Sequence, residues 1–290
     1  MTYIWQPTPE QAQQWRAQGY FVIRNVLPRD LALQLLGVIR NVILTPEPDA
    51  KTDEDPMDPM GAPPAARAAR FRKLSRFCSK SPLIWRHVHG GEAMLRVAQH
   101  FLGNDIMLKF DSCFLKPART GSATPWHQDN GLWRDDETEP FNFWMALDPA
   151  TKANGCLQMI PGSHKGEIIP HVLYEDSIHG EIPREIVAQM KERHGIHHIE
   201  LDSGDVVCWH SSMMHYSPPN TSEQGRIAIA GVYTNPQITT TRRFAGDYYW
   251  VMKGGKVSNA FPPEVYPIEQ NGSVPPFPKA EEAAGSLVSA

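Results

Sequence analysis

Thr124-Pro125-Trp126-His127-Gln128-Asp129-Asn130 is the stretch around which the rest of the chain is organised. Alternate side chains of a β-strand point to the same face, so we expect His127 and Asp129 to face the same way, about 7 Å apart. An imidazole and a carboxylate are two ligands of a divalent metal. A second histidine would complete the 2-His-1-carboxylate set that suits non-haem Fe(II). Taken alone, the tripeptide is weak evidence and fits a solvated loop better, so the metal interpretation depends on a third ligand.

Size and charge limit the kind of partner. The chain has 290 residues, 41% of them hydrophobic, and 28 Lys and Arg oppose 32 Asp and Glu for a net charge of −4. This length suffices for one large domain with a full core. The near balance of charge gives no electrostatic footprint for nucleic acid or for an anionic membrane. We therefore expect neither nucleic acid nor a membrane as a partner, and we expect the chain to act as a monomer or homodimer.

The sequence predicts a cytoplasmic protein. The N-terminal residues lack the basic segment and apolar run of a secretory signal, and the apolar runs are too short to cross a bilayer. Four cysteines are scattered without CxxC spacing: Cys78, Cys113, Cys156 and Cys208. Buried free thiols in a reducing compartment are typical of this pattern.

Helices are predicted mainly in the first third of the chain. Thr8 and Gln11 fit a capping box that begins a helix at Pro9, and Gly19 should end it before a short strand over Tyr20–Ile23. A second helix should begin after Pro28. A third helix is expected over Pro82–Phe101, with Gly103 ending it.

Short β-rich runs separated by turn residues follow, and the fold class they predict is α+β with a mainly β core, a sandwich or a barrel. The expected strands are Ile106–Lys116, Phe141–Leu147, Cys156–Ile160, Ile196–Leu201, Val206–Trp209 and Arg226–Thr234. We expect a single domain over 1–290. Within it, composition predicts a flexible loop at 45–69, a lid insertion at 164–197 with a helix at Arg184–Arg193, and a loosely ordered tail at 258–290.

A second cluster, downstream, supplies candidates for the third metal ligand. His210 lies at the end of an expected strand, and His215 begins the next segment. Arg226 begins a strongly β-forming run and, if it faces inward beside the small Ala228 and Ala230, can form a bidentate pair with a ligand carboxylate. From the residue type alone, an exposed arginine at a strand end is the favoured interpretation, and both histidines stay open.

Taken together, the motifs between about residue 8 and residue 235 resemble a known family. They are Phe114-Leu115-Lys116-Pro117 before Trp126-His127-Gln128-Asp129; Trp144, Asn154-Gly155-Cys156-Leu157 and Pro161-Gly162-Ser163-His164-Lys165; and Gly204-Asp205, His215-x-Ser217-x-x-Asn220-x-Ser222 and Arg226. Their order and spacing resemble the phytanoyl-CoA dioxygenase family of Fe(II)/2-oxoglutarate-dependent oxygenases.

The resemblance implies a role for each matched residue. In the family the distal iron ligand stands eleven residues before the co-substrate arginine, which selects His215 over His210. His127, Asp129 and His215 would then hold Fe(II), and Arg226 would pair with the distal carboxylate of 2-oxoglutarate. Ser217 is expected to add a hydrogen bond. Two further residues, Gln128 and Trp144, match positions lining the co-substrate pocket, whereas Lys73 and Lys109 are candidates for other polar contacts that no motif fixes.

The resemblance also implies a fold and a reaction. The fold is a double-stranded β-helix, a jelly-roll or cupin-like barrel flanked by N-terminal helices. The reaction consumes O2 and 2-oxoglutarate, releases succinate and CO2, and hydroxylates, desaturates or cyclises a C–H bond of a small metabolite or natural product. Asp129 argues against halogenation, since halogenases of this general class lack the carboxylate. Two alternatives are a non-redox metal-dependent isomerase or hydrolase and a degenerate ligand-binding barrel.

Overall fold

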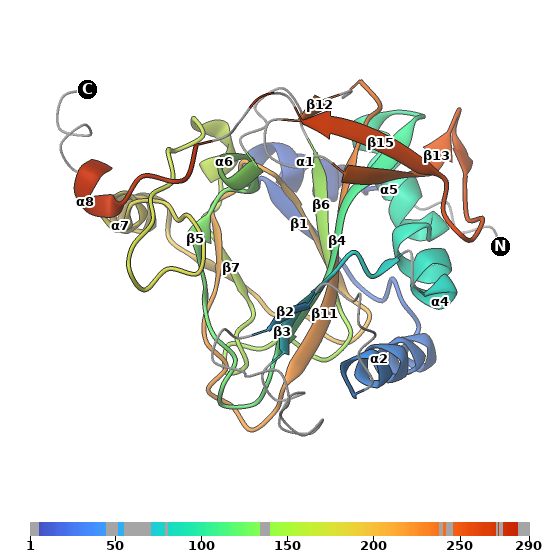
Figure 1. The fold of residues 1–290 in the computed structure, drawn as a ribbon, viewed down its shortest axis with the longest axis horizontal. Coiled ribbons are helices and arrows are strands. Elements are labelled where there is room, and N and C mark those ends of the chain that lie inside the picture. The colour runs from blue at the N-terminus through green and yellow to red at the C-terminus, as the bar shows by residue number, and fades with distance from the viewer. Residues whose placement is uncertain are drawn as a thin grey trace.

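Two β-sheets face one another, and helices cover the outside of the larger sheet (Figure 1). The computed structural model describes residues 6–44, 52–54, 71–78, 81–133, 140–237, 240–241, 246–270, 272 and 275–283. In the large sheet the order is β1 (Tyr20–Ile23), β9 (Val206–His210), β6 (Phe141–Ala146), β11 (Arg226–Thr234), β4 (Ile106–Lys116), β13 (Gly246–Lys253), β15 (Val265–Gln270) and β12 (Thr240–Thr241).

Three short strands extend the large sheet, and four form the small one. β2 (Thr52–Glu54) pairs with β3 (Phe71–Ser75), which pairs with β4, while β14 (Lys256–Val257) pairs with β13. The small sheet has the order β5 (Thr124–His127), β10 (His215–Ser217), β7 (Leu157–Met159) and β8 (His197–Ile199). Every expected strand range between 106 and 234 contains a strand, which confirms the α+β, jelly-roll-like prediction. The described strands form two separate sheets rather than a closed barrel, and that part of the expectation is corrected.

The first helix begins and ends where the sequence predicts. In α1 (Pro9–Gln18) the Thr8 hydroxyl accepts from the Gln11 backbone N–H at 3.2 Å, and the Gln11 side chain accepts from the Thr8 N–H at 2.9 Å. This reciprocal capping box satisfies two donors that the helix itself leaves without partners. Gly19 ends the helix with a φ of 86°, a left-handed conformation that glycine adopts without strain.

The third predicted helix is broken in the structure. The segment Pro82–Phe101 folds as α4 (Pro82–Ile84), a π-helical turn η2 (Trp85–His89) and α5 (Glu92–Leu102). Two consecutive glycines, Gly90 and Gly91, separate the last two pieces, and Gly91 serves as the N-cap of α5. The apolar spacing is continuous across the break, so periodicity alone did not reveal it.

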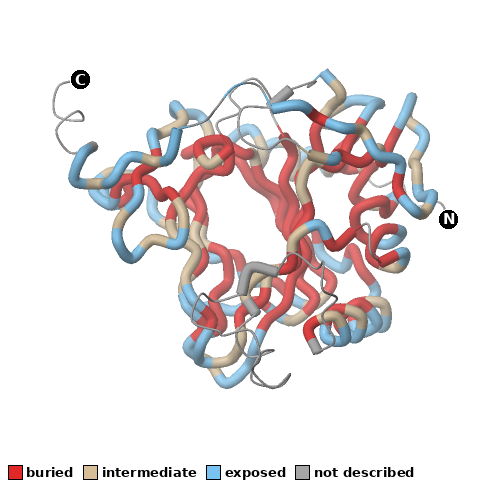
Figure 2. The backbone as a smooth tube through the Cα atoms, in the orientation of Figure 1, coloured by how far each residue is buried: buried red, intermediate tan, exposed pale blue. Residues whose placement is uncertain are grey.

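Alternation along β11 sorts the core into two layers. Ile227, Ile229 and Tyr233 belong to the outer core, which includes side chains of α2 (Arg29–Leu44) and α5. Ala228 and Ala230 belong to an inner cluster between the two sheets. Successive strand residues face opposite sides, so the middle of this strand carries large residues toward the helices and small residues toward the interior. Figure 2 shows buried residues along the strands of both sheets and exposed residues on outer helix surfaces.

The three segments expected to be irregular differ in outcome. Of the predicted loop 45–69, residues 45–51 and 55–69 lie outside the described residues, whereas Thr52–Glu54 form β2. The segment 164–197 contains the rest of the short turn η3 (Ser163–Lys165) and the predicted helix as α7 (Arg184–His194). The described part of the tail is more regular than expected, because β15 pairs with β13 and β12, and α8 (Ala280–Ala283) follows.

All four cysteines are buried and carry thiols, as predicted. Among the described helices, none combines the length and the apolar character needed to cross a bilayer.

Candidate active site

Two histidines face each other across the small sheet. β10 pairs antiparallel with β5, and His215 and His127 are register partners. Directly opposite residues of an antiparallel pair project to the same face. The two imidazole rings are therefore close, with centroids 4.0 Å apart at an interplanar angle of 49°. Strand pairing, and not proximity in the sequence, brings these two side chains together.

Asp129 joins the histidines by a different route from the one expected. β5 ends at His127, and Asp129 begins the short helix α6 (Asp129–Trp133), so the premise of a continuous strand through both residues is wrong. The turn still brings the carboxylate beside both rings. Asp129 Oδ1 lies 3.6 Å from His127 Nε2, and Asp129 Oδ2 lies 4.0 Å from His215 Nε2. One ligand atom from each residue lies within 4.8 Å of the other two.

The hydrogen bonds of the two rings leave one nitrogen of each for a metal. His127 Nδ1 lies 2.8 Å from the Pro125 carbonyl, and His215 Nδ1 lies 3.0 Å from the Met213 carbonyl. A carbonyl only accepts, so each Nδ1 carries the proton and each Nε2 presents its lone pair to the cluster. Burial and the neighbouring His127 lower the pKa of His215 to about 4, although Asp129 opposes the shift. Two neutral imidazoles and one carboxylate fit a divalent iron.

Trp209 holds the carboxylate in place. Its indole Nε1 donates to Asp129 Oδ2 at 3.1 Å from the end of β9. Burial alone would raise the pKa of Asp129, but His215, His127 and the Trp209 hydrogen bond outweigh it, and the pKa is lowered overall. Asp129 is therefore ionised at neutral pH, as a metal ligand must be.

His210, the rival ligand, lies on the other side of the large sheet. Along β9, Val207 and Trp209 face the inner cluster and Cys208 faces the outer core, so alternation sends His210 outward. Its Nδ1 accepts from the Ser212 backbone N–H at 3.1 Å. The structure thus brings His215, and not His210, to His127 and Asp129.

Arg226 is a buried cation that retains unused donors. The residue is 2% exposed, and its Nη2 donates to the Gly155 carbonyl at 2.6 Å and to Ser217 Oγ at 2.8 Å. Its Nε and Nη1 have no hydrogen-bond partner within the part of the chain that the structure describes. Burial lowers the pKa of Arg226 to about 10, so the guanidinium stays charged at neutral pH. Such a group fits an incoming carboxylate.

Two other residues expected at the co-substrate, Trp144 and Ser217, also line the cavity. Trp144 lines the cavity, with the Arg226 guanidinium 4.8 Å from its ring centroid. The Ser217 hydroxyl donates to the Gly155 carbonyl at 2.9 Å and accepts from Arg226, so in this structure it positions the arginine.

Gln128 is the clearest departure from the expected site. It is fully buried but is not among the residues that line the cavity. Its Nε2 donates to the Ser212 carbonyl at 2.8 Å, and its Oε1 accepts from the Ile169 N–H at 2.8 Å. In this structure Gln128 ties the residue before α6 to the segment after η3, and its contact with the co-substrate stays a prediction.

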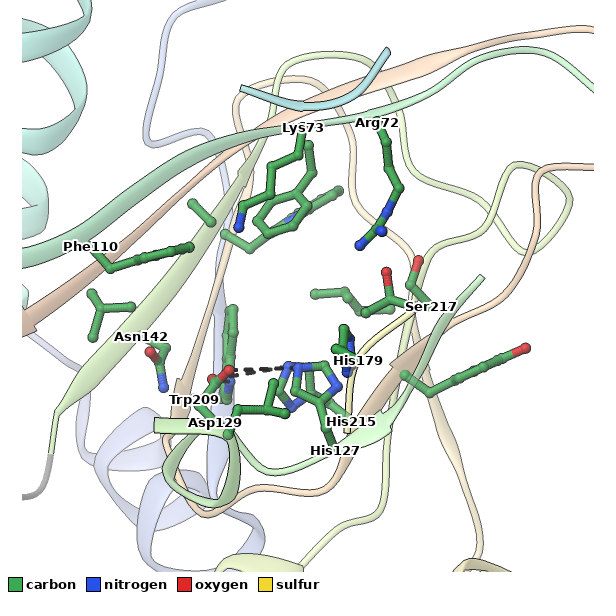
Figure 3. Close-up of a pocket in the computed structure, with 18 of the residues that line it drawn as sticks. Arg72, Lys73, Phe110, His127, Asp129, Asn142, His179, Trp209, His215 and Ser217 are labelled. Carbon is green, nitrogen blue, oxygen red and sulfur yellow. Dashed lines mark hydrogen bonds and ion pairs between the residues drawn. The ribbon is translucent and has the colours of Figure 1, made fainter. Parts of the chain in front are cut away.

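The three metal-ligand candidates and Arg226 line one cavity of about 460 Å³ (Figure 3). Lys73 also lines it, with its Nζ 4.8 Å from the centroid of Phe110, whereas Lys109 does not and lies over Trp133. Sequence reasoning missed several lining residues, namely Arg72, Lys116, Asn142, His179 and Trp209. The sequence did hold a signal for Asn142, because it lies two residues before Trp144 on one expected strand, and such side chains face the same side.

Comparison with known proteins adds family evidence. The sequence profile of the family described as phytanoyl-CoA dioxygenase (PhyH) matches residues 15–228. A probable phytanoyl-CoA dioxygenase of Caenorhabditis elegans is 31% identical over 161 residues, covering 49% of this chain and 48% of that protein. The L-proline trans-4-hydroxylase of Streptomyces griseoviridis is 27% identical over 168 residues, covering 51% and 61%. The chain thus spans about half the length of these relatives.

Solved structures share the fold. EctD from S. alaskensis, solved with 2-oxoglutarate and 5-hydroxyectoine, has a TM-score of 0.66 at 22% identity, covering 82% of this chain and 78% of that one. ThoJ, described as a non-heme monooxygenase, has a TM-score of 0.63 at 21% identity, covering 97% and 94%. At these identities the likeness concerns the architecture.

Proposed function

The chain belongs to the phytanoyl-CoA dioxygenase family, and we propose that it is an Fe(II)- and 2-oxoglutarate-dependent dioxygenase acting on a C–H bond of a small molecule. One observation carries this proposal: a 2-His-1-carboxylate cluster and a buried arginine with unused donors line the same cavity. When bound, iron and 2-oxoglutarate supply the oxidising chemistry, in which O2 is consumed and succinate and CO2 are released. Hydroxylation is the primary reaction proposed, with desaturation or ring formation as variants.

The metal would be held by His127, Asp129 and His215. Each histidine presents Nε2, because its Nδ1–H is committed to a backbone carbonyl. Trp209 fixes the rotamer of Asp129 through its indole N–H. Three ligands on one side of a metal leave the other side open to co-substrate and O2, which is what an oxygenase requires.

The co-substrate would be held at the Arg226 end of the cavity. The unused Nε and Nη1 of Arg226 would donate to the distal carboxylate of 2-oxoglutarate. Its Nη2 is held by the Gly155 carbonyl and by Ser217 Oγ. A charged pair in a buried site is stronger than in water, since the local dielectric is low. The inner alanines Ala228 and Ala230 keep side-chain bulk away from this volume.

The non-redox alternative explains less of the site. A metal-dependent isomerase or hydrolase would use the same three ligands but would leave Arg226 buried with two donors unused, a costly arrangement without a function. A degenerate ligand-binding barrel would not need the metal-ligand cluster. Arg226 therefore favours the oxygenase.

The substrate is proposed to be a small molecule, as the name of the proline hydroxylase relative suggests. We propose a single domain over 1–290 in which the segment 164–197 acts as a lid, a role supported by Ile178 and His179, which line the cavity. The buried thiols fit a reducing compartment and support a cytoplasmic location. A monomeric or homodimeric state and the lack of a nucleic-acid partner stay predictions.

The test is 2-oxoglutarate turnover by the purified protein. Succinate is measured with Fe(II), O2 and 2-oxoglutarate, first alone and then with a panel of small metabolites. We expect succinate to require all three components, to be lost in His215→Ala and to persist in the matched control His210→Ala. Succinate formation that survives in His215→Ala, or turnover of a panel compound with zinc and without O2, would contradict the proposal.

A further inference from the structure

One row of side chains crosses four strands of the large sheet on the inner face. Asn142 is the register partner of Trp209 on one side and of Val232 on the other, and Val232 is the partner of Phe110. Directly opposite residues share a face, and all four line the cavity. In Figure 3, Asn142 and Phe110 lie on one side of the metal-ligand cluster and Ser217 lies on the other.

The amide of Asn142 has a fixed orientation. Its Nδ2 donates to Ser211 Oγ at 2.7 Å, and that hydroxyl donates its own hydrogen to the Pro140 carbonyl at 3.1 Å. A hydroxyl has a single hydrogen, so Ser211 must accept from Asn142, and the NH2 group of the amide must face Ser211. Asn142 Oδ1 is consequently the polar atom left for the cavity.

This oxygen has no protein donor. Asn142 is 0% exposed, and no residue in the described part of the chain donates to its Oδ1. Buried acceptors without partners are rare in folded proteins and point to a ligand or to another function. Asn142 is therefore an unsatisfied acceptor built into the wall of a cavity that also contains the metal-ligand cluster.

The co-substrate cannot satisfy this acceptor. At neutral pH the two carboxylates and the ketone of 2-oxoglutarate accept hydrogen bonds and carry no O–H or N–H donor. The acceptor is thus left for the substrate.

We propose that Asn142 Oδ1 orients the substrate, and that the substrate carries an O–H or N–H donor beside an apolar body. Phe110 and Val232 form the apolar wall next to the amide, and Trp133 lies beside Phe110 at a centroid distance of 6.4 Å. A site built to accept a hydrogen bond discriminates against analogues that lack the donor, because the acceptor is then left unpaired. This inference rests on the proposed function, which places 2-oxoglutarate at Arg226.

A matched pair of probes tests it. Indole carries one N–H donor on a flat apolar body, and 1-methylindole lacks the donor. Binding of each probe is measured by ligand-observed NMR on the full chain loaded with Zn(II), a redox-silent metal, and 2-oxoglutarate. We expect indole to bind the wild type roughly fivefold more tightly than 1-methylindole, as one hydrogen bond allows. In Asn142→Leu this preference should vanish, while 2-oxoglutarate affinity stays within about twofold of the wild type.

Each outcome has a defined meaning. Three outcomes would overturn the inference: equal binding of both probes to the wild type, failure of both to bind at millimolar concentration, or a preference that survives in Asn142→Leu. The last outcome would show that the methyl group of 1-methylindole simply does not fit. Asn142→Ala also removes the acceptor, adds no bulk and should likewise lose the preference, so the test holds even if the leucine variant does not fold. Failure of the wild type to bind Zn(II) and 2-oxoglutarate would instead count against the proposed function.

Discussion

Lys116 and Arg226 are register partners on β4 and β11, and both are buried basic residues that line the same cavity. Lys116 Nζ points to the carbonyls of Ser122 and Pro218 at 2.5 and 2.6 Å. Burial, Arg226 and Arg72 together lower the pKa of Lys116 to about 6. At neutral pH this amine is therefore mostly neutral beside a charged guanidinium.

This pairing predicts proton uptake when 2-oxoglutarate binds. The dianion favours the protonated amine and so raises the pKa of Lys116 from about 6. A group whose pKa rises on binding takes up a proton between its old and new pKa values, and affinity therefore increases as pH falls toward 6. Calorimetry of the metal-loaded protein at pH 7, in two buffers of different ionisation enthalpy, should detect a fraction of one proton. Lys116→Gln should lose it; a wild type that takes up no proton would contradict the prediction.

Trp209→Phe should weaken metal binding with little change in packing. It removes the hydrogen bond that orients Asp129, and loss of such a support lowers metal affinity by about 10–100-fold. Competition of each protein with a chelating dye for Fe(II) under exclusion of O2 measures the effect. Trp85→Phe is the matched control, because Trp85 is fully buried and its Nε1 has no partner among the described residues. A similar loss in both variants would show that packing, and not the hydrogen bond, is responsible.

Arg226→Met should abolish stabilisation by 2-oxoglutarate. In the wild type, a ligand at 100 times its Kd raises the free energy of unfolding by about 2.7 kcal/mol. The ligand-free variant should melt within a few degrees of the wild type, since removing two unsatisfied donors offsets the loss of two hydrogen bonds. Thermal melts with and without 2-oxoglutarate test both statements. Arg119→Met, which removes an exposed partner of Glu223, should respond to the ligand like the wild type.

Gln128→Met tests the structural role assigned to that residue. The substitution removes hydrogen bonds to the Ser212 carbonyl and from the Ile169 N–H, and should lower the free energy of unfolding by about 1–3 kcal/mol. The Kd for 2-oxoglutarate should stay within twofold, measured by calorimetry alongside urea denaturation. An unchanged stability together with a much weaker Kd would return Gln128 to the co-substrate pocket.

Local signals in the sequence predicted local features well. The capping box of Thr8 and Gln11 and the stop at Gly19 depend on nearest neighbours along the chain, and the structure confirms them. Strand alternation predicted that Arg226 faces the same side of the sheet as Ala228 and Ala230, and in the structure all three are buried. Family spacing then selected His215, which the structure places beside His127.

Features that depend on strand pairing could not be predicted from the sequence. The match of Asn142 with Trp209 and Val232 is a property of three strands distant in the sequence. Strand alternation by itself turns Gln128 away from the face that His127 and Asp129 share, and only its position in the family motif suggested a pocket contact. Which residues of separate strands lie opposite one another depends on the pairing register, and no local pattern fixes that register.

The most direct test is an anaerobic titration of the metal-free protein with Fe(II) and 2-oxoglutarate, watching for the weak visible absorption of a 2-oxo acid chelated to Fe(II). It requires no knowledge of the substrate. We predict that the absorption appears in the wild type and in His210→Ala and is lost in Asp129→Ala. A folded wild-type protein that gives no such absorption would contradict the assignment of this cavity to an iron- and 2-oxoglutarate-dependent oxygenase.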